Sequence, residues 1–225
     1  MTNNHSRHWH LLFLCGLFAL LAVLVARTQV GAGAPANEND LLLFEAGPIE
    51  TTEPYTHSAT TTTRDGEALH IIQFTGPIED AWLTAVEATG TELVHYVANY
   101  GYLVWAGESS RSQLEHLAAN SDFLRFSAPY ASSLKSGRSL RMAQAEEEGN
   151  REIVVTIQML HHDGRFETEQ LLDTLIIEQL TPWGQVLNYQ NMRALISLSE
   201  LERIATLPDV VRIEAYQAPQ LMDEK

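Results

Sequence analysis

The side chains best suited to chemistry in this sequence are two adjacent histidines followed by an aspartate. His161, His162 and Asp163 precede Gly164, and imidazole and carboxylate groups are common ligands of zinc. Adjacent side chains on a turn seldom converge on one ion, and Asp-Gly is a sequence typical of turns. The segment therefore predicts a polar turn, and we expect no metal site and no cofactor.

The remaining histidines and motifs give no indication of catalysis. His70 and His95 lie in predicted strands, where we expect both at a sheet surface. The sequence contains no G-x-S-x-G nucleophile motif, no H-E-x-x-H zinc motif and no glycine-rich phosphate-binding motif. The only cysteine, Cys15, lies in an apolar run near the N-terminus. We therefore expect a protein that is not an enzyme and has no catalytic residue.

An internal repeat organises the part of the chain that follows residue 66. Three segments recur in the same order: 72–74 as 157–159, 112–118 as 199–205, and 123–126 as 210–213. One such match could arise by chance, but three in the same order indicate a duplicated module.

Each copy has the same predicted order of strands and helices. In the first copy the elements are strand 69–74, helix 78–89, a hairpin over 93–106 with its turn at 98–101, a helix from Ser112, and strand 123–126. In the second copy they are strand 153–160, helix 167–180, hairpin 186–198, a helix from Ser199, and strand 210–213. This βαββαβ order predicts an α+β protein of two tandem ferredoxin-like modules. Each module would be a four-stranded antiparallel sheet with two helices on one face and the other face free.

Local signals mark the ends of these helices. Gly90 is placed to end the first helix in the left-handed conformation that glycine adopts easily. Ser112 with Glu115, and Ser199 with Glu202, have the spacing of capping boxes at the starts of two others.

The N-terminal segment has the pattern of an export signal. Arg7 precedes an apolar run over residues 11–26, and small residues follow around Ala34. We predict a secreted or extracytoplasmic protein that meets the membrane only through a cleaved signal peptide. The predicted organisation is signal peptide 1–34, linker 35–66, module 67–135, linker 136–151, module 152–221 and tail 222–225.

The charge balance excludes a general affinity for nucleic acid. The chain has a net charge of −15, and removing residues 1–34 removes two basic residues and no acidic ones, leaving −17. Nucleic-acid binding requires a basic surface. We therefore expect a neutral or basic protein partner.

Several segments resemble the N-terminal prodomains of bacterial subtilisin-like serine peptidases. In the first copy the segments are 76–78 together with Trp82, then 102–104, then 125–126 together with Pro129, Tyr130 and Lys135. In the second copy the segment is 207–214. The resemblance covers residues 69–221 and implies ferredoxin-like modules that bind the peptidase through a sheet face, as intramolecular chaperone and inhibitor. It also implies that the C-terminal tail lies in the substrate cleft, as extended peptides do in other complexes.

The resemblance places five residues closest to that substrate cleft: Tyr216, Ala218, Pro219, Gln220 and Leu221. No peptidase motif occurs in the sequence, so the catalytic domain is expected as a partner either in cis, in a longer precursor, or in trans. Two alternatives stay open. One is a secreted scaffold or adhesion protein that uses two modules for avidity, and the other is a sensor that binds a small ligand between the modules.

Overall fold

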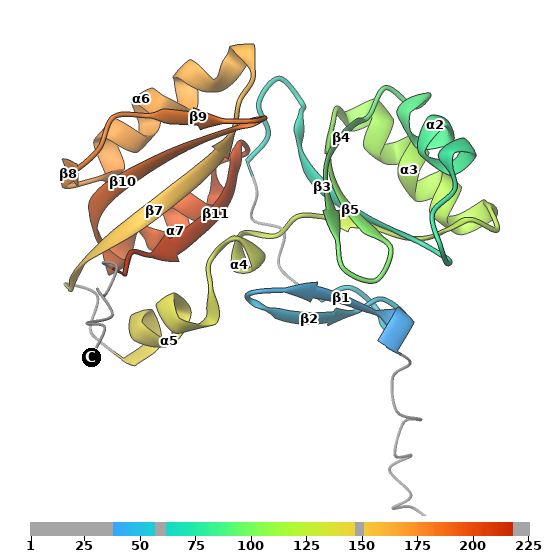
Figure 1. The fold of residues 1–225 in the computed structure, drawn as a ribbon, viewed down its shortest axis with the longest axis horizontal. Helices are drawn as coiled ribbons and strands as arrows, with labels where there is room; N and C mark the ends of the chain where they lie inside the picture. The colour runs from blue at the N-terminus through green and yellow to red at the C-terminus, as the bar shows by residue number, and fades with distance from the viewer. Residues whose placement is uncertain (1–37, 57–61, 147–150, 218–225) are drawn as a thin grey trace, which may run out of the picture. The chain divides into compact units, whose positions relative to one another are not determined.

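A computed structural model describes residues 38–56, 62–146 and 151–217 of the chain. These residues all belong to one unit. They form an α+β structure with antiparallel sheets and, within the described ranges, six α-helices (Figure 1). The predicted signal peptide, residues 1–34, lies outside the described residues. Among the described helices, none combines the length and the apolar character that a membrane span requires.

The first four-stranded sheet contains the strands predicted for the first copy. Its elements are β3 (Ala68–Phe74), α2 (Asp80–Glu87), β4 (Glu92–Val97), β5 (Gly101–Ala106), α3 (Glu108–Asn120) and β6 (Leu124–Pro129). The strands lie in the order β4-β5-β3-β6, and all neighbours are antiparallel. Both helices cover one face of this sheet (Figure 1), where Phe74, Val86 and Leu114 are fully buried in a common core.

Two local signals in this part of the chain gave different outcomes. Gly90 has a φ of 81°, which confirms the predicted left-handed end of the first helix, and Asn99 and Tyr100 also have positive φ in the predicted turn between β4 and β5. The predicted capping box at Ser112 is wrong, because α3 begins at Glu108 and the Ser112 hydroxyl donates a hydrogen bond to the Glu108 carbonyl inside the helix. A glutamate in the first turn suits the positive end of the helix dipole.

The opposite face of the first sheet is covered by a hairpin that the sequence did not predict. A short 3₁₀-helix (Glu38–Asp40) leads into β1 (Leu41–Phe44) and β2 (Gly47–Glu50), which pair with each other. Leu42 and Ile49 are buried against the sheet residues Leu69 and Leu103 in a second core. The predicted linker over 35–66 is therefore wrong for residues 38–50, and the free face expected for this module is occupied.

Close contacts hold this hairpin on the sheet. A Cβ atom at Gly101 would lie 2.4 Å from Cδ2 of Leu42, so the Leu42 side chain packs directly on the β5 backbone. The buried Gln73 amide donates to the carbonyls of Asn39 and Asn99 at 3.0 and 2.9 Å, and Asn99 donates to the Leu41 carbonyl at 2.8 Å. The hairpin is thus an integral part of the first sheet's packing.

The second sheet contains the strands predicted for the second copy. Its elements are β7 (Glu152–Leu160), α6 (Phe166–Leu175), β8 (Glu178–Gln179), β9 (Gly184–Val186), β10 (Tyr189–Ser197), α7 (Leu201–Thr206) and β11 (Val210–Ala215). The strand order is β11-β7-β10-β8, and β9 pairs with another part of β10. With β8 and β9 taken as one interrupted strand, the order matches that of the first sheet. One face of β7, β10 and β11 packs against α6 and α7 in a third core.

Two helix boundaries of the second copy differ from the prediction. The helix expected over 167–180 ends at Leu175, and the Ile177 amide instead donates to the Leu195 carbonyl of β10. Two consecutive β-branched residues, Ile176 and Ile177, favour an extended backbone there. The expected capping box at Ser199 is also wrong, because Ser197 caps a 3₁₀-helix (Leu198–Glu200) that precedes α7.

The predicted linker over 136–151 is partly helical. The chain between the sheets forms α4 (Ser132–Lys135) and α5 (Arg138–Glu146). Leu140 of α5 is 1% exposed and belongs to the core of the second sheet. A single buried leucine among polar residues explains why the sequence pattern resembled an exposed linker.

Candidate functional site

The face of the second sheet that is not covered by α6 and α7 carries polar side chains in two rows. The strand registers align Arg212, Gln158 and Asn191 in one row, and Glu214, Thr156 and Arg193 in the next. Arg212 is exposed and the other five are half-buried. We call these six residues the polar face. It offers hydrogen-bond donors and acceptors to a partner, in contrast to the covered face of the first sheet.

Tyr216, one of the predicted partner-binding residues, lies beside the polar face. Its amide donates to the Val154 carbonyl at 2.9 Å, which continues the pairing of β11 with β7 by one residue. The guanidinium carbon of Arg193 lies 4.6 Å from the centroid of the Tyr216 ring, within the range of a cation–π interaction. The other predicted residues, Ala218, Pro219, Gln220 and Leu221, lie outside the described residues.

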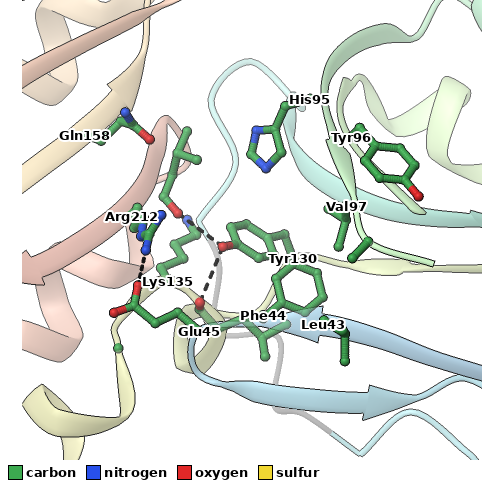
Figure 2. Close-up of a pocket in the computed structure, with 14 residues that line it drawn as sticks. Leu43, Phe44, Glu45, His95, Tyr96, Val97, Tyr130, Lys135, Gln158 and Arg212 are labelled. Carbon is green, nitrogen blue, oxygen red and sulfur yellow. Dashed lines mark hydrogen bonds and ion pairs between the residues drawn. The ribbon is translucent and has the colours of Figure 1, made fainter. Parts of the chain in front are cut away.

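A cleft adjoins one end of the polar face (Figure 2). Its volume is about 200 Å³. The lining comes from the hairpin (Leu43–Glu45), from the end of β4 and the turn after it (His95–Ala98), from the segment between β6 and α5 (Tyr130, Leu134, Lys135 and Gly137), and from Gln158, Val211 and Arg212. Gln158 and Arg212 thus belong both to the cleft and to the polar face, which makes the two parts one continuous surface.

An ion pair crosses the cleft. Figure 2 shows the Glu45 carboxylate of the hairpin joined to the Arg212 guanidinium of β11. Arg212 also pairs with Glu214 of the polar face. Two carboxylates therefore hold one guanidinium at the rim of the cleft.

Two ring side chains of the cleft, Tyr130 and His95, are uncharged at neutral pH. Burial raises the pKa of Tyr130, whose hydroxyl lies 3.1 Å from the Val211 carbonyl and 3.3 Å from the Leu134 carbonyl. Burial, and secondarily the charge of Arg212, lowers the pKa of His95. Nδ1 of His95 lies 2.7 Å from the Tyr189 hydroxyl. The net charge of the cleft is therefore set by Glu45, Arg212 and Lys135.

Lys135 is a fully buried lysine beneath the cleft. Its Nζ donates to the Leu207 carbonyl at 2.7 Å, just after the end of α7, where a cation complements the helix dipole. Burial lowers its pKa to about 7, although the nearby carboxylates of Asp209 and Glu202 act in the opposite direction. Folding therefore buries an amine that the unfolded chain would hold as a cation.

Replacing Lys135 by methionine is expected to flatten the pH dependence of stability between pH 7 and pH 10. The pKa of this amine is 10.5 in the unfolded chain and about 7 in the folded protein. Unfolding therefore takes up a proton in this range, and stability rises as the pH increases, by at most about 1.4 kcal/mol per pH unit. Urea unfolding at several pH values measures this slope. The pH is kept below 10.0, the ordinary pKa of tyrosine, so that tyrosine ionisation does not contribute. A variant with the slope of the unmodified protein would contradict the prediction.

The predicted polar turn at residues 161–164 is present, but one of its histidines belongs to a buried cluster. A 3₁₀-helix (Asp163–Arg165) follows His162, whose Nδ1 accepts a hydrogen bond from the Gly164 amide at 3.2 Å. Nε2 of the same ring lies 3.2 Å from Oδ2 of Asp209, which is fully buried. Within the described part of the chain, no three histidine, aspartate, glutamate or cysteine side chains are grouped closely enough to hold a metal ion.

Asp209 is the centre of this cluster. Its Oδ2 accepts hydrogen bonds from Arg64 Nη1 at 3.0 Å and from the Thr168 hydroxyl at 2.7 Å. Arg64 is 8% exposed, and it also donates to Thr168 at 2.5 Å and to the Gly164 carbonyl. We call Arg64, His162, Thr168 and Asp209 the Arg64 cluster. Sequence reasoning missed it, because no local pattern relates residues 145 positions apart.

The expectation that His70 lies at a sheet surface is wrong. His70 is fully buried, and its Nε2 lies 2.8 Å from the Ser127 hydroxyl. Burial lowers its pKa to about 3, with a smaller contribution from Arg111. The ring is therefore neutral at physiological pH. All seven residues of β3 are buried, because both faces of the first sheet are covered.

Comparison with known proteins relates the first sheet and its hairpin to a family without a known function. Residues 38–131 match the model of a family described as a domain of unknown function, DUF8729. The matched range begins at the 3₁₀-helix before β1 and ends after β6, so it includes the hairpin that covers the first sheet. No curated protein and no solved structure matches the chain.

Proposed function

We propose that this chain is an exported, non-enzymatic protein that binds and inhibits a subtilisin-like serine peptidase in the manner of a prodomain. The contact would be made by the polar face of the second sheet together with the segment that follows β11. The peptidase domain would be supplied in cis or in trans.

The topology supports this proposal. Both sheets are antiparallel and share one element order and one strand order, with the interrupted strand β8–β9 counted once. We infer from this order that both units are ferredoxin-like modules, since the order is that expected of a βαββαβ repeat. Resemblance of short segments to the prodomain family, together with this topology, favours a protein-binding role.

The observation that carries the proposal is the polar face with Tyr216 at its edge. A sheet face with six hydrogen-bonding side chains in register suits a folded partner, and the chain leaves this sheet beside that face. An extended segment after Tyr216 could pair with the partner's backbone, as in other peptide-recognition complexes. Because the hairpin occupies the equivalent face of the first sheet, the second module is the one that would make this contact.

Inhibition of a purified subtilisin by residues 38–225 tests the proposal directly. This range keeps the hairpin, whose removal would expose the buried face of the first sheet. We expect the protein to slow cleavage of a peptide substrate, and removal of residues 216–225 to relieve most of the inhibition.

A charge reversal tests whether the polar face, and not another part of the surface, contacts the peptidase. Arg193→Glu should weaken inhibition at least tenfold, about 1.4 kcal/mol, because it reverses a charge of the polar face and removes the contact with Tyr216. Arg203→Glu on α7 is the matched control, since Arg203 is exposed and pairs only locally with Glu200, and it should inhibit normally. Absence of inhibition by the unmodified protein, or equal weakening by both variants, would refute the proposal.

A further inference from the structure

We propose that the cleft binds a small zwitterion, namely a free amino acid with an apolar side chain. Its carboxylate would pair with Arg212 and its ammonium group with Glu45. This inference is independent of peptidase binding, because it rests on the geometry of the cleft alone.

The ion pair across the cleft defines the chemistry of the ligand. Glu45 and Arg212 come from elements 167 residues apart in the sequence, and each side chain is 48% exposed. An ion pair at this exposure contributes only about 0–1 kcal/mol, so a ligand can replace it at little cost. A simple anion would pair with Arg212 but leave Glu45 without its partner, and a simple cation would do the reverse. A zwitterion pairs with both groups at once.

The backbone around the cleft leaves space for the Glu45 carboxylate. A Cβ atom at Gly137 would lie 3.0 Å from Oε1 of Glu45, so a larger residue at this position would displace the carboxylate. On the other wall, Glu214 holds the Arg212 guanidinium from the side of the polar face. The two charged groups are thus each supported at opposite walls of the same cleft.

The size and the remaining lining of the cleft suit a single amino acid. Apolar side chains, including Leu43, Val97 and Val211, line the cleft beside the charged pair. Its volume of about 200 Å³ equals the share of roughly six to seven liquid waters, at about 30 Å³ each. Because His95 is neutral, it offers hydrogen bonding without a further charge. This lining would accept an aliphatic side chain, and the volume suits a single amino acid.

Calorimetric titration of residues 38–225 with leucine, valine and methionine tests the inference without any peptidase. We expect saturable binding of at least one of the three. The N-acetyl derivative of an amino acid lacks the ammonium charge, and its amide lacks the carboxylate. N-acetyl-leucine and leucinamide should therefore each bind at least tenfold more weakly than leucine, and the same derivatives of valine or methionine serve if one of those binds best.

Variants of the ion pair provide the second arm of the test. Glu45→Gln and Arg212→Gln should each reduce the affinity at least tenfold, whereas Arg203→Gln, at an exposed ion pair outside the cleft, should leave it unchanged. Circular dichroism of each variant verifies folding, and both cleft residues are exposed enough for folding to persist. Failure of all three amino acids to bind would overturn the inference, as would equal binding of N-acetyl-leucine or leucinamide.

Discussion

Replacing Arg64 by methionine is expected to lower the free energy of unfolding by about 3 kcal/mol or more. Asp209 is fully buried and Arg64 is 8% exposed, so their charges compensate each other away from water. Methionine fills a similar volume but leaves the Asp209 carboxylate with the Thr168 hydroxyl as its hydrogen-bond donor and with Nε2 of His162 at 3.2 Å. Loss of one partner from a buried ion pair typically costs about 3–5 kcal/mol, because the other charge stays buried.

Urea denaturation of Arg64→Met and of a matched control measures this effect. Arg203→Met removes a charge from an exposed pair with Glu200, where Arg203 is 67% exposed, and should change stability by less than about 0.5 kcal/mol. The double variant Arg64→Met, Asp209→Leu should be more stable than the sum of the single losses predicts, because no charge is then left buried. An Arg64→Met variant as stable as the control would show that the Arg64 cluster does not hold the fold together.

Replacing Leu42 by alanine is expected to destabilise the protein by roughly 2–5 kcal/mol. Leu42 is fully buried between the hairpin and the first sheet, and its side chain contacts the backbone at Gly101. The substitution leaves a cavity over β5 and removes a principal anchor of the hairpin. We also expect faster proteolysis within residues 38–56, because the weakened hairpin opens more often.

The neighbouring residue supplies the control for this prediction. Leu43 points to the other side of β1 and is 51% exposed, so Leu43→Ala removes the same atoms from an exposed position. It should change the free energy of unfolding by less than about 0.5 kcal/mol. Equal effects of the two substitutions would indicate that the hairpin is a dispensable cover and not part of the core.

The long strands of both copies could be predicted closely because their signals are local, whereas β8 (Glu178–Gln179) fell within the helix expected over 167–180. The β-rich run at 69–74 became β3 over Ala68–Phe74, and the run at 153–160 became β7 over Glu152–Leu160. Side-chain alternation, branched residues and turn sequences act over a few residues. The internal repeat shows the same pattern twice, so each copy supported the prediction made for the other. The polar turn at 161–164 followed from equally local chemistry.

The predictions that failed depended on packing between distant segments. Residues 41–50 form strands of only four residues each, which are too short for a distinctive periodic signal, so they were predicted as a linker. Their burial on the first sheet also reversed the expectation for His70, because a strand that is covered on both faces has no surface side. The polar character of a side chain does not indicate whether another segment covers it.

The sequence by itself determined the duplicated order of strands and helices, the ends of several of them, and the acidic charge of the chain. Only the tertiary structure decided which sheet face is covered, which residues line the cleft, and that Arg64 meets Asp209. The physical reason is the sequence separation of the residues that interact. Backbone preferences and turn chemistry are properties of neighbouring residues. The burial of the first sheet's face depends instead on a hairpin that meets residues 34 and 58 positions away, and the Arg64–Asp209 pair joins residues 145 positions apart.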